Sequence, residues 1–87
     1  MYELVYSREA IRSLRKMTDN TAKRICAKLE KLAEDPYAPN NNIKALKGSE
    51  ANYRLRIGDW RALYMLNKNT KQIIIVEIAT RGEVYKS

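Results

Sequence analysis

The sequence predicts an α+β fold in which a helical hairpin packs on one face of a mainly antiparallel four-stranded sheet. Residues 8–34 contain two stretches with apolar residues at helical spacing. Residues 53–80 contain three stretches rich in β-branched and aromatic residues, separated by turn residues. A short strand candidate precedes the helices, which gives the order β-α-α-β-β-β. Because 87 residues suffice for one compact unit, we expect a single domain over residues 1–87.

The N-terminal half supplies one strand and two helices. Residues 2–6 suit a pleated strand, and Ser7 is a good N-cap for a helix over residues 8–17. A second helix is expected from about residue 21 to residue 34. The apolar stripes of the two helices are Ala10, Ile11, Leu14 and Met17, and then Ala22, Ile25, Cys26, Leu29, Leu32 and Ala33. So short a link predicts an antiparallel helical hairpin, with the cysteine as a small core residue.

The C-terminal half is expected to form a meander of three strands. These strands cover residues 53–57, 60–66 and 71–80. Gly58-Asp59 fits a two-residue hairpin loop, because glycine supplies positive φ at the first central position. The last strand is apolar nearly throughout, which is typical of a strand covered on both faces.

The first hairpin gathers three guanidinium groups on one face of the sheet. Side chains alternate between faces, and a two-residue loop pairs Arg56 with Arg61 and Arg54 with Leu63. Like charges that face each other across two strands are destabilising. We therefore expect these arginines to hold an anion.

The register of the last strand depends on the loop before it. Loops at residues 67–69 and at residues 68–69 are both possible, and they place opposite sets of side chains on the arginine side. We favour the three-residue loop because it brings Glu77 among the arginines as a partial counter-ion and puts Arg81 at the rim, where Tyr85 can fold back. It pairs Leu66 with Thr70 and places on the arginine side Ile73, Ile75, Glu77 and Arg81.

Composition narrows the class of function. A net charge of +7 favours a polyanionic partner such as nucleic acid. The absence of histidine and the single cysteine, Cys26, argue against a zinc site, a Cys/His nucleophile and an internal disulfide. Residues 1–20 lack the apolar core of a secretory signal, and no stretch approaches the ~20 apolar residues of a membrane span. We expect a cytoplasmic protein without metal or cofactor.

Some side chains have two interpretations. Lys44 and Lys47, in the connector over residues 43–52, either contact a nucleic-acid backbone or are simply solvated. The aromatic residues expected on the core side of their strands, and therefore in packing more than in base stacking, are Tyr53, Trp60 and Tyr64.

Two segments, YRLRIGDWRALY at residues 53–64 and TRGEVY at residues 80–85, flank the apolar last strand. This pattern resembles the RelE/ParE toxin superfamily of bacterial and archaeal toxin–antitoxin modules. The N-terminal strand and helix pair also match in order and size, so the resemblance covers most of the chain. It implies a toxin with a cognate acidic antitoxin as its partner.

The RelE branch of this superfamily comprises mRNA interferases, which cut mRNA in the ribosomal A site. Its site uses two basic residues on the second strand, an arginine opening the third strand, an arginine after the fourth and a tyrosine beyond. Here arginine occupies both second-strand positions, where relatives often have lysine. The resemblance implies catalytic roles for Arg56, Arg61, Arg81 and Tyr85, and the expected RNA-binding residues are Arg54, Lys44 and Lys47.

RNA can be cut without metal when its own 2′-OH attacks the adjacent phosphate. The reaction needs a base, cations for the growing phosphoryl charge and help for the leaving oxygen. Tyr85 is the candidate base if Arg61 and Arg81 lower its pKa from ~10, and Glu77 is its rival. The general acid stays open, because arginine is a poor proton donor.

Two other functions stay possible at this point. A ParE-like toxin that inhibits DNA gyrase without catalysis would not need the arginine and tyrosine of the C-terminal segment. A basic nucleic-acid-binding module with a decayed site would need no antitoxin gene beside its own.

Overall fold

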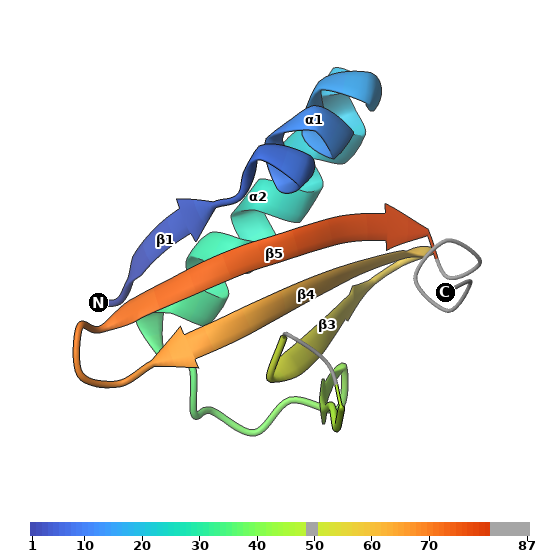
Figure 1. The fold of residues 1–87 in the computed structure, drawn as a ribbon. Coiled ribbons are helices and arrows are strands. Elements are labelled where there is room, and N and C mark those ends of the chain that lie inside the picture. Colours follow the sequence, from blue (N-terminus) through green and yellow to red (C-terminus); the bar gives the residue numbers. More distant parts are fainter. Residues whose placement is uncertain (49–50, 81–87) are drawn as a thin grey trace.

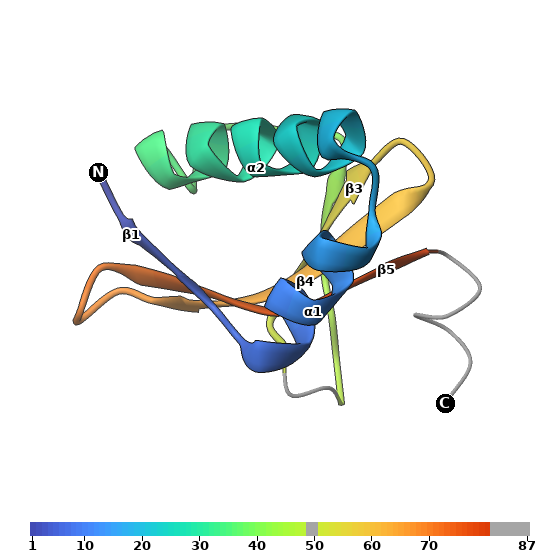
Figure 2. The same ribbon diagram turned by 90° about the horizontal axis from the view of Figure 1, so that it is seen from above.

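The structure is a computed structural model that describes residues 1–48 and 51–80. Its elements are β1 (Glu3–Tyr6), α1 (Arg8–Lys16), α2 (Asp19–Glu34), β2 (Ile43–Ala45), β3 (Tyr53–Ile57), β4 (Trp60–Asn67) and β5 (Gln72–Thr80). The strands form one sheet in the order β1-β5-β4-β3-β2, with β1 parallel to β5 and the other pairs antiparallel. Both helices contribute to one core with the sheet, and α2 runs along its back (Figures 1 and 2). The predicted α+β class is confirmed.

The sheet has five strands where the sequence predicted four. The additional strand, β2, lies in the segment interpreted as a connector and pairs Ile43 with Leu55 and Lys44 with Arg54. Three residues are too few to show an alternating pattern, so sequence alone could not reveal this strand. Its consequence is that the outer edge of β3 is already hydrogen-bonded.

Each helix begins at a side-chain cap. The Ser7 hydroxyl accepts the Ala10 N–H at 3.0 Å, and the Thr18 hydroxyl accepts the Thr21 N–H at 3.3 Å. The second helix therefore begins at Asp19, earlier than predicted. The Ser7 hydroxyl has a second role, since it donates to the carbonyl of Val76 at 2.6 Å and so ties the start of α1 to β5.

The predicted pairing of Leu66 with Thr70 is wrong. Leu66 faces Ile73 instead, because the turn before β5 is longer and passes through Lys71, whose φ is +54°. The predicted position of Ile73 and Ile75 on the arginine side is wrong for the same reason: both are fully buried against the helices.

A β-bulge further along β5 then returns Glu77 to the predicted side of the sheet, although its pairing differs from the predicted register. Leu63 faces Glu77 while Tyr64 faces Ile75, so Val76 is the extra residue. The bulge lets one strand bury Ile75 on the helix side and still present Glu77 on the opposite side. A bulge leaves no signal in an almost uniformly apolar strand, so the sequence could not predict it.

The core lies between the helices and one side of the sheet. Its buried members are Ala10, Ile25, Leu29, Leu32, Ala33, Leu55, Ile57, Ala62, Tyr64, Ile73, Ile75 and Ile78. The expected packing roles of three aromatic residues agree with this, since Tyr64 is buried and Tyr53 and Trp60 pack against the core. The rings of Tyr53 and Tyr64 stack with centroids 5.5 Å apart. Burial, with the nearby Tyr53, raises the pKa of Tyr64 to about 12, so this phenol stays neutral.

Candidate nucleic-acid interface

The side of the sheet opposite the helices carries the arginines, as predicted. Arg56 faces Arg61 across β3 and β4, and Arg54 faces Leu63. The hairpin between them turns at Gly58, whose φ is +61°. We call this surface the arginine face and define it by Lys44, Arg54, Arg56, Arg61 and Glu77.

Pairing of β2 adds Lys44 to the arginine face. It lies directly opposite Arg54, so it belongs to the row that continues through Leu63 to Glu77. This position places the positive charge of Lys44 next to that of Arg54, which favours contact with a nucleic-acid backbone over simple solvation. Lys47 is also exposed but follows β2, and no strand pairing brings it into this row.

Arg61 lies on the arginine face but is only 7% exposed, whereas Arg56 is exposed. Nη1 of Arg61 donates to the carbonyls of Trp60 at 3.2 Å and Gly58 at 3.4 Å. Its Nε is buried, and no acceptor within the described residues pairs with it. Arg61 therefore braces the hairpin as well as carrying charge, which the sequence did not predict.

Glu77 lies on the arginine face opposite Leu63, two residues before Ala79, which faces Arg61. The predicted placement is confirmed, yet among the described residues no salt bridge joins Glu77 to Arg56 or Arg61. The positive charge of this arginine pair is thus uncompensated by that carboxylate. A buried guanidinium group without an anionic partner is costly, and an anionic ligand would relieve that cost.

Two of the expected catalytic residues, Arg81 and Tyr85, lie outside the described residues. β5 ends at Thr80, two positions beyond Ile78, which packs in the core. Ala79, the last residue before Thr80, faces Arg61 across the strands. The last described residues of β5 therefore lie beside Arg61.

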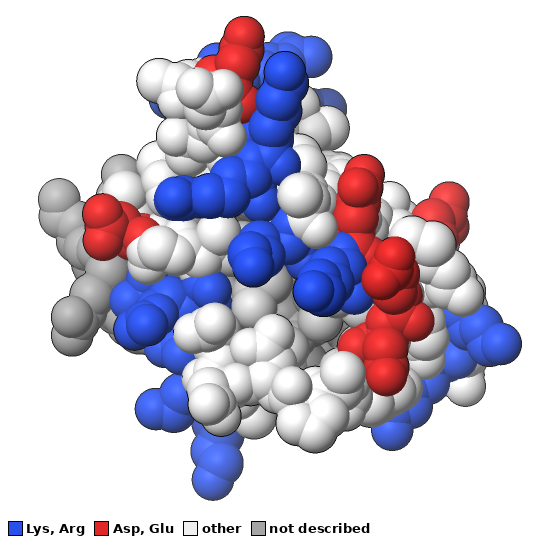
Figure 3. Space-filling view, turned by 180° about the vertical axis from the view of Figure 1, so that it is seen from behind, with Lys and Arg blue, Asp and Glu red and all other residues white. Residues whose placement is uncertain are grey.

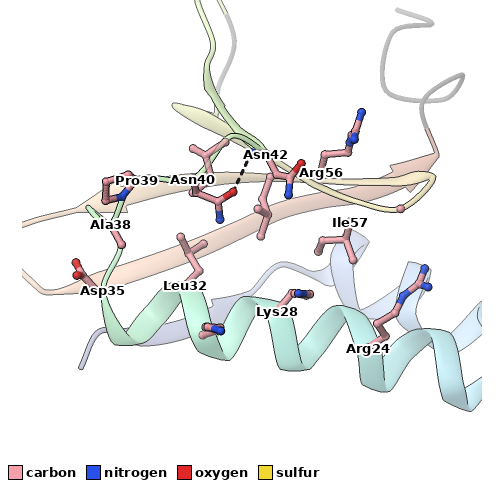
Figure 4. A pocket seen from close by; sticks show the side chains of 14 residues that line it. Arg24, Lys28, Leu32, Asp35, Ala38, Pro39, Asn40, Asn42, Arg56 and Ile57 are labelled. Carbon is pink, nitrogen blue, oxygen red and sulfur yellow. Dashed lines mark hydrogen bonds between the residues drawn. The ribbon is translucent and has the colours of Figure 1, made fainter.

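Sequence analysis missed a second basic feature on the helix side. A groove of about 500 Å³ lies between α2 and β3, and we call it the α2–β3 groove. Its cationic lining residues are Arg24, Lys28, Lys31 and Arg56. Figure 3 shows Lys and Arg side chains gathered across this side of the molecule, and Figure 4 shows Arg24 and Lys28 rising from α2 toward β3. Three of these cations are four and then three residues apart on α2, and this spacing in the sequence could have predicted that they lie on one side of the helix.

Within residues 1–48 and 51–80, no three His, Cys, Asp or Glu side chains gather closely enough to hold a metal ion. Neither described helix is both long and apolar enough to cross a membrane.

Comparison with known proteins agrees with the fold and identifies the family. The family model described as the ParE toxin of type II toxin–antitoxin systems matches residues 4–85. The chain is 31% identical over 81 residues to a candidate toxin, RelE1, of Methanocaldococcus jannaschii, which covers 92% of this chain and 90% of the relative.

Solved structures show the same fold. The archaeal RelE–RelB complex of Pyrococcus horikoshii OT3 matches with a TM-score of 0.78 at 24% identity, over 93% of this chain and 96% of the other. The isolated Escherichia coli RelE toxin matches with a TM-score of 0.75 at 21% identity, over 99% of this chain and 93% of the other. On the family model and the archaeal relative, the chain belongs to the RelE/ParE family of type II toxin–antitoxin toxins.

Proposed function

We propose that this toxin is an endoribonuclease that cleaves mRNA by attack of the ribose 2′-OH on the adjacent phosphate. The observation that carries the proposal is the facing pair of Arg56 and Arg61, with Arg54 and Lys44 in the neighbouring row. Guanidinium groups match phosphate oxygens in forked hydrogen bonds. A site that holds several of them against their mutual repulsion suits a phosphate whose negative charge grows during reaction.

The proposed roles divide between charge and proton transfer. Arg56, Arg61 and Arg81 stabilise the phosphoryl oxygens, and Arg54, Lys44 and Lys47 bind the RNA backbone. Tyr85 accepts the proton of the 2′-OH. The 2′-oxygen then forms a bond to phosphorus while the bond from phosphorus to the 5′-oxygen breaks. The products are a 2′,3′-cyclic phosphate and a 5′-OH, and neither metal nor cofactor takes part.

The donor of the proton to the leaving 5′-oxygen has a candidate on the arginine face. Lys44 lies opposite Arg54, and an ammonium group gives up a proton far more readily than a guanidinium group. Lysine on β2 can therefore supply what the two arginines on β3 cannot.

The proposed partners are a cognate antitoxin, mRNA and the ribosomal A site. The solved relatives include the RelE–RelB complex of Pyrococcus horikoshii and the RelB–RelE complex of Methanococcus jannaschii. We propose that this chain likewise binds an acidic antitoxin in a hetero-oligomer in the cytoplasm. Opposite charge should speed their encounter, so the association rate should fall as salt rises. An association rate that stays flat across ionic strength would count against binding at the arginine face.

Primer extension on mRNA in a translating extract tests the proposal. Purified wild-type protein should produce new 5′ ends, and Tyr85→Phe should reduce cleavage by about 10²–10⁴, the usual worth of a positioned base. Glu77→Gln should matter less. The opposite ranking would move the base to Glu77. If no variant cuts RNA while a parallel supercoiling assay shows gyrase inhibition, the chain works as a non-catalytic gyrase inhibitor instead.

A further inference from the structure

The α2–β3 groove lies on the other side of the sheet from the arginine face, yet the two meet at the β3–β4 hairpin. Arg56 belongs to the arginine face and also lines the rim of the groove. Gly58, at the tip, lines the groove and accepts a hydrogen bond from Arg61. A chain molecule bound on the arginine face can therefore continue around this hairpin into the groove.

The helical wall of the groove presents a regular row of cations. Arg24, Lys28 and Lys31 are all exposed, and their spacing puts them on one side of α2 about 6 Å and 4.5 Å apart along the axis. No carboxylate of the described residues forms a salt bridge with any of the three. Their charge is available to a ligand.

Arg24 also contacts the hairpin itself. A methyl group on the α-carbon of Gly58 would lie 2.9 Å from Nη2 of Arg24, so the guanidinium group rests against this glycine. The row of helix cations thus reaches the point where the groove joins the arginine face. Figure 4 shows Arg24 at that end of the groove and Arg56 pointing away from α2.

The opposite wall is a loop with fixed backbone geometry. The Asn40 side-chain oxygen accepts the Asn42 N–H at 2.8 Å, and the Asn42 carbonyl accepts the Arg56 N–H at 2.9 Å. The Asp35 carboxylate accepts the Tyr37 N–H at 3.2 Å. A preformed wall lowers the entropy lost when a ligand binds.

The character of the groove distinguishes between kinds of polyanion. Its large apolar side chains Leu32, Leu55 and Ile57 are only 4–7% exposed, and the other apolar lining residues are the small Ala38 and Pro39 and the half-buried Ile43. The groove therefore lacks the row of large exposed apolar side chains against which an amphipathic acidic helix packs. A peptide cannot add as a strand to β3, because β2 already occupies its outer edge, and β2 itself offers an edge of only three residues. The polar lining has four cations, the amides of Asn40 and Asn42 and one carboxylate, Asp35, and this excess of cations suits the phosphates of a nucleic-acid backbone.

We propose that the α2–β3 groove binds the RNA strand beside the cleavage position, through contacts of Arg24, Lys28 and Lys31 with its phosphates. This inference rests on the proposed ribonuclease function and extends it: the arginine face holds the reacting phosphate, and the groove holds the phosphates that follow. The groove cations act by positioning the strand and take no part in the proton transfers.

The test is equilibrium binding to a single-stranded RNA of 2′-O-methyl nucleotides, which cannot be cleaved, measured by fluorescence anisotropy over a salt series. The test variant combines Arg24→Gln, Lys28→Gln and Lys31→Gln. Its matched control combines Arg12→Gln, Arg15→Gln and Lys16→Gln on α1, which removes the same charge from exposed helix positions. Circular dichroism confirms that each variant is folded.

Each phosphate contact with a single strand contributes about 0.7 to the slope of log K against log salt, so the groove variant should lose about 2 from that slope. The control should lose less than half of that. The double variant Lys28→Gln with Lys31→Gln keeps the contact between Arg24 and Gly58 and should lose about 1.4. In single-turnover cleavage, the groove variant should raise the RNA concentration needed for half-maximal rate and leave the rate at saturation within a few-fold.

Several results would overturn the inference. Equal salt slopes for the groove variant and the control would do so, and so would failure of the wild type to bind this RNA. A groove variant that binds RNA normally but no longer binds an acidic antitoxin peptide would assign the groove to a protein partner. The ribonuclease proposal fails separately: if wild type cuts no RNA but the slope difference persists, the groove binds RNA and the reaction assignment is wrong.

Discussion

The two sides of the sheet differ in the physical effect that places their side chains. The helix side is specified by hydrophobic burial, and its isoleucines and leucines would fill the same space in several arrangements. The arginine face is specified by strand register, because only one pairing brings Arg56 opposite Arg61 and Arg54 opposite Lys44. A one-residue slip would exchange the two sides completely. Function on the arginine face therefore depends on the strand register, whereas packing of the core depends mainly on the burial of apolar side chains.

Neighbouring isoleucines on β5 give the largest expected difference between the two sides. Ile75 is fully buried against the helices, whereas Ile74 pairs with Met65 on the other side and is partly exposed. Ile75→Ala should lower the free energy of unfolding by about 2–5 kcal/mol, since it opens a cavity in the core. Ile74→Ala should cost less than half as much. Urea denaturation measures both, and equal losses would contradict the burial of Ile75 on the helix side with Ile74 on the other.

The hairpin that joins the two basic regions should be the next most sensitive point. Gly58→Ala puts a side chain at φ +61° and against Arg24, whereas Gly48→Ala meets only the backbone strain of φ +67°, with nothing within 4 Å. We expect a loss of about 1–3 kcal/mol at Gly58 and about 1 kcal/mol at Gly48. Combining Gly58→Ala with Arg24→Ala should recover part of the loss in thermal melts. Without such recovery, Arg24 does not rest on the hairpin as described.

The two helix caps allow a smaller comparison. Ser7 caps α1 and also donates to Val76 in the bulge, whereas Thr18 caps α2 at an exposed position. Ser7→Ala should therefore cost about 1.5–2 kcal/mol and Thr18→Ala about 0.5–1 kcal/mol. Chemical denaturation of the two variants distinguishes them. A cost at Ser7 no greater than at Thr18 would show that the bond to Val76 adds nothing.

Lys44 should show the smallest effect on stability and a selective effect on function. It is exposed and faces Arg54, so Lys44→Gln removes a repulsion and should leave the unfolding free energy within about 0.5 kcal/mol of wild type or slightly above it. RNA binding should weaken, with a salt slope smaller by about 0.7. Lys16→Gln, at an exposed position on α1, is the control and should change the slope less.

The sequence predicted features that depend on local geometry. Alternation along β3 and β4 and the glycine at the tip were sufficient to pair Arg56 with Arg61, because a two-residue turn leaves no freedom in register. Helical spacing predicted both helices within three residues of their observed ends. The α+β class followed from the order of these elements.

What the sequence could not predict depends on long-range contacts. The carbonyl of Val76, in the bulge, accepts a hydrogen bond from Ser7, which is 69 residues away, so the residues next to Val76 in the sequence give no sign of the bulge. β2 forms because its backbone pairs with the edge of β3. The burial of Arg61 on the arginine face also gives no signal in the sequence. Substitution of Arg61 should weaken the hairpin as well as remove charge, because its side chain donates to the carbonyls of Trp60 and Gly58. The groove joins elements that are distant in sequence.

The central claim is that placement by register, and not overall positive charge, makes the catalytic surface. Single-turnover cleavage of mRNA on programmed ribosomes tests it with two variants of equal net charge: Arg56→Gln with Arg61→Gln on the arginine face, and Arg12→Gln with Arg15→Gln on α1. Because Arg61 also braces the hairpin, circular dichroism and thermal melts first show that each variant is folded at the assay temperature. At protein concentrations that saturate binding, the face variant should lose about 10²–10³ in rate or more, the usual effect of removing one donor to a developing oxyanion, and the helix variant should stay within a few-fold of wild type. Equal losses in the two variants would contradict the claim and leave charge alone as the explanation.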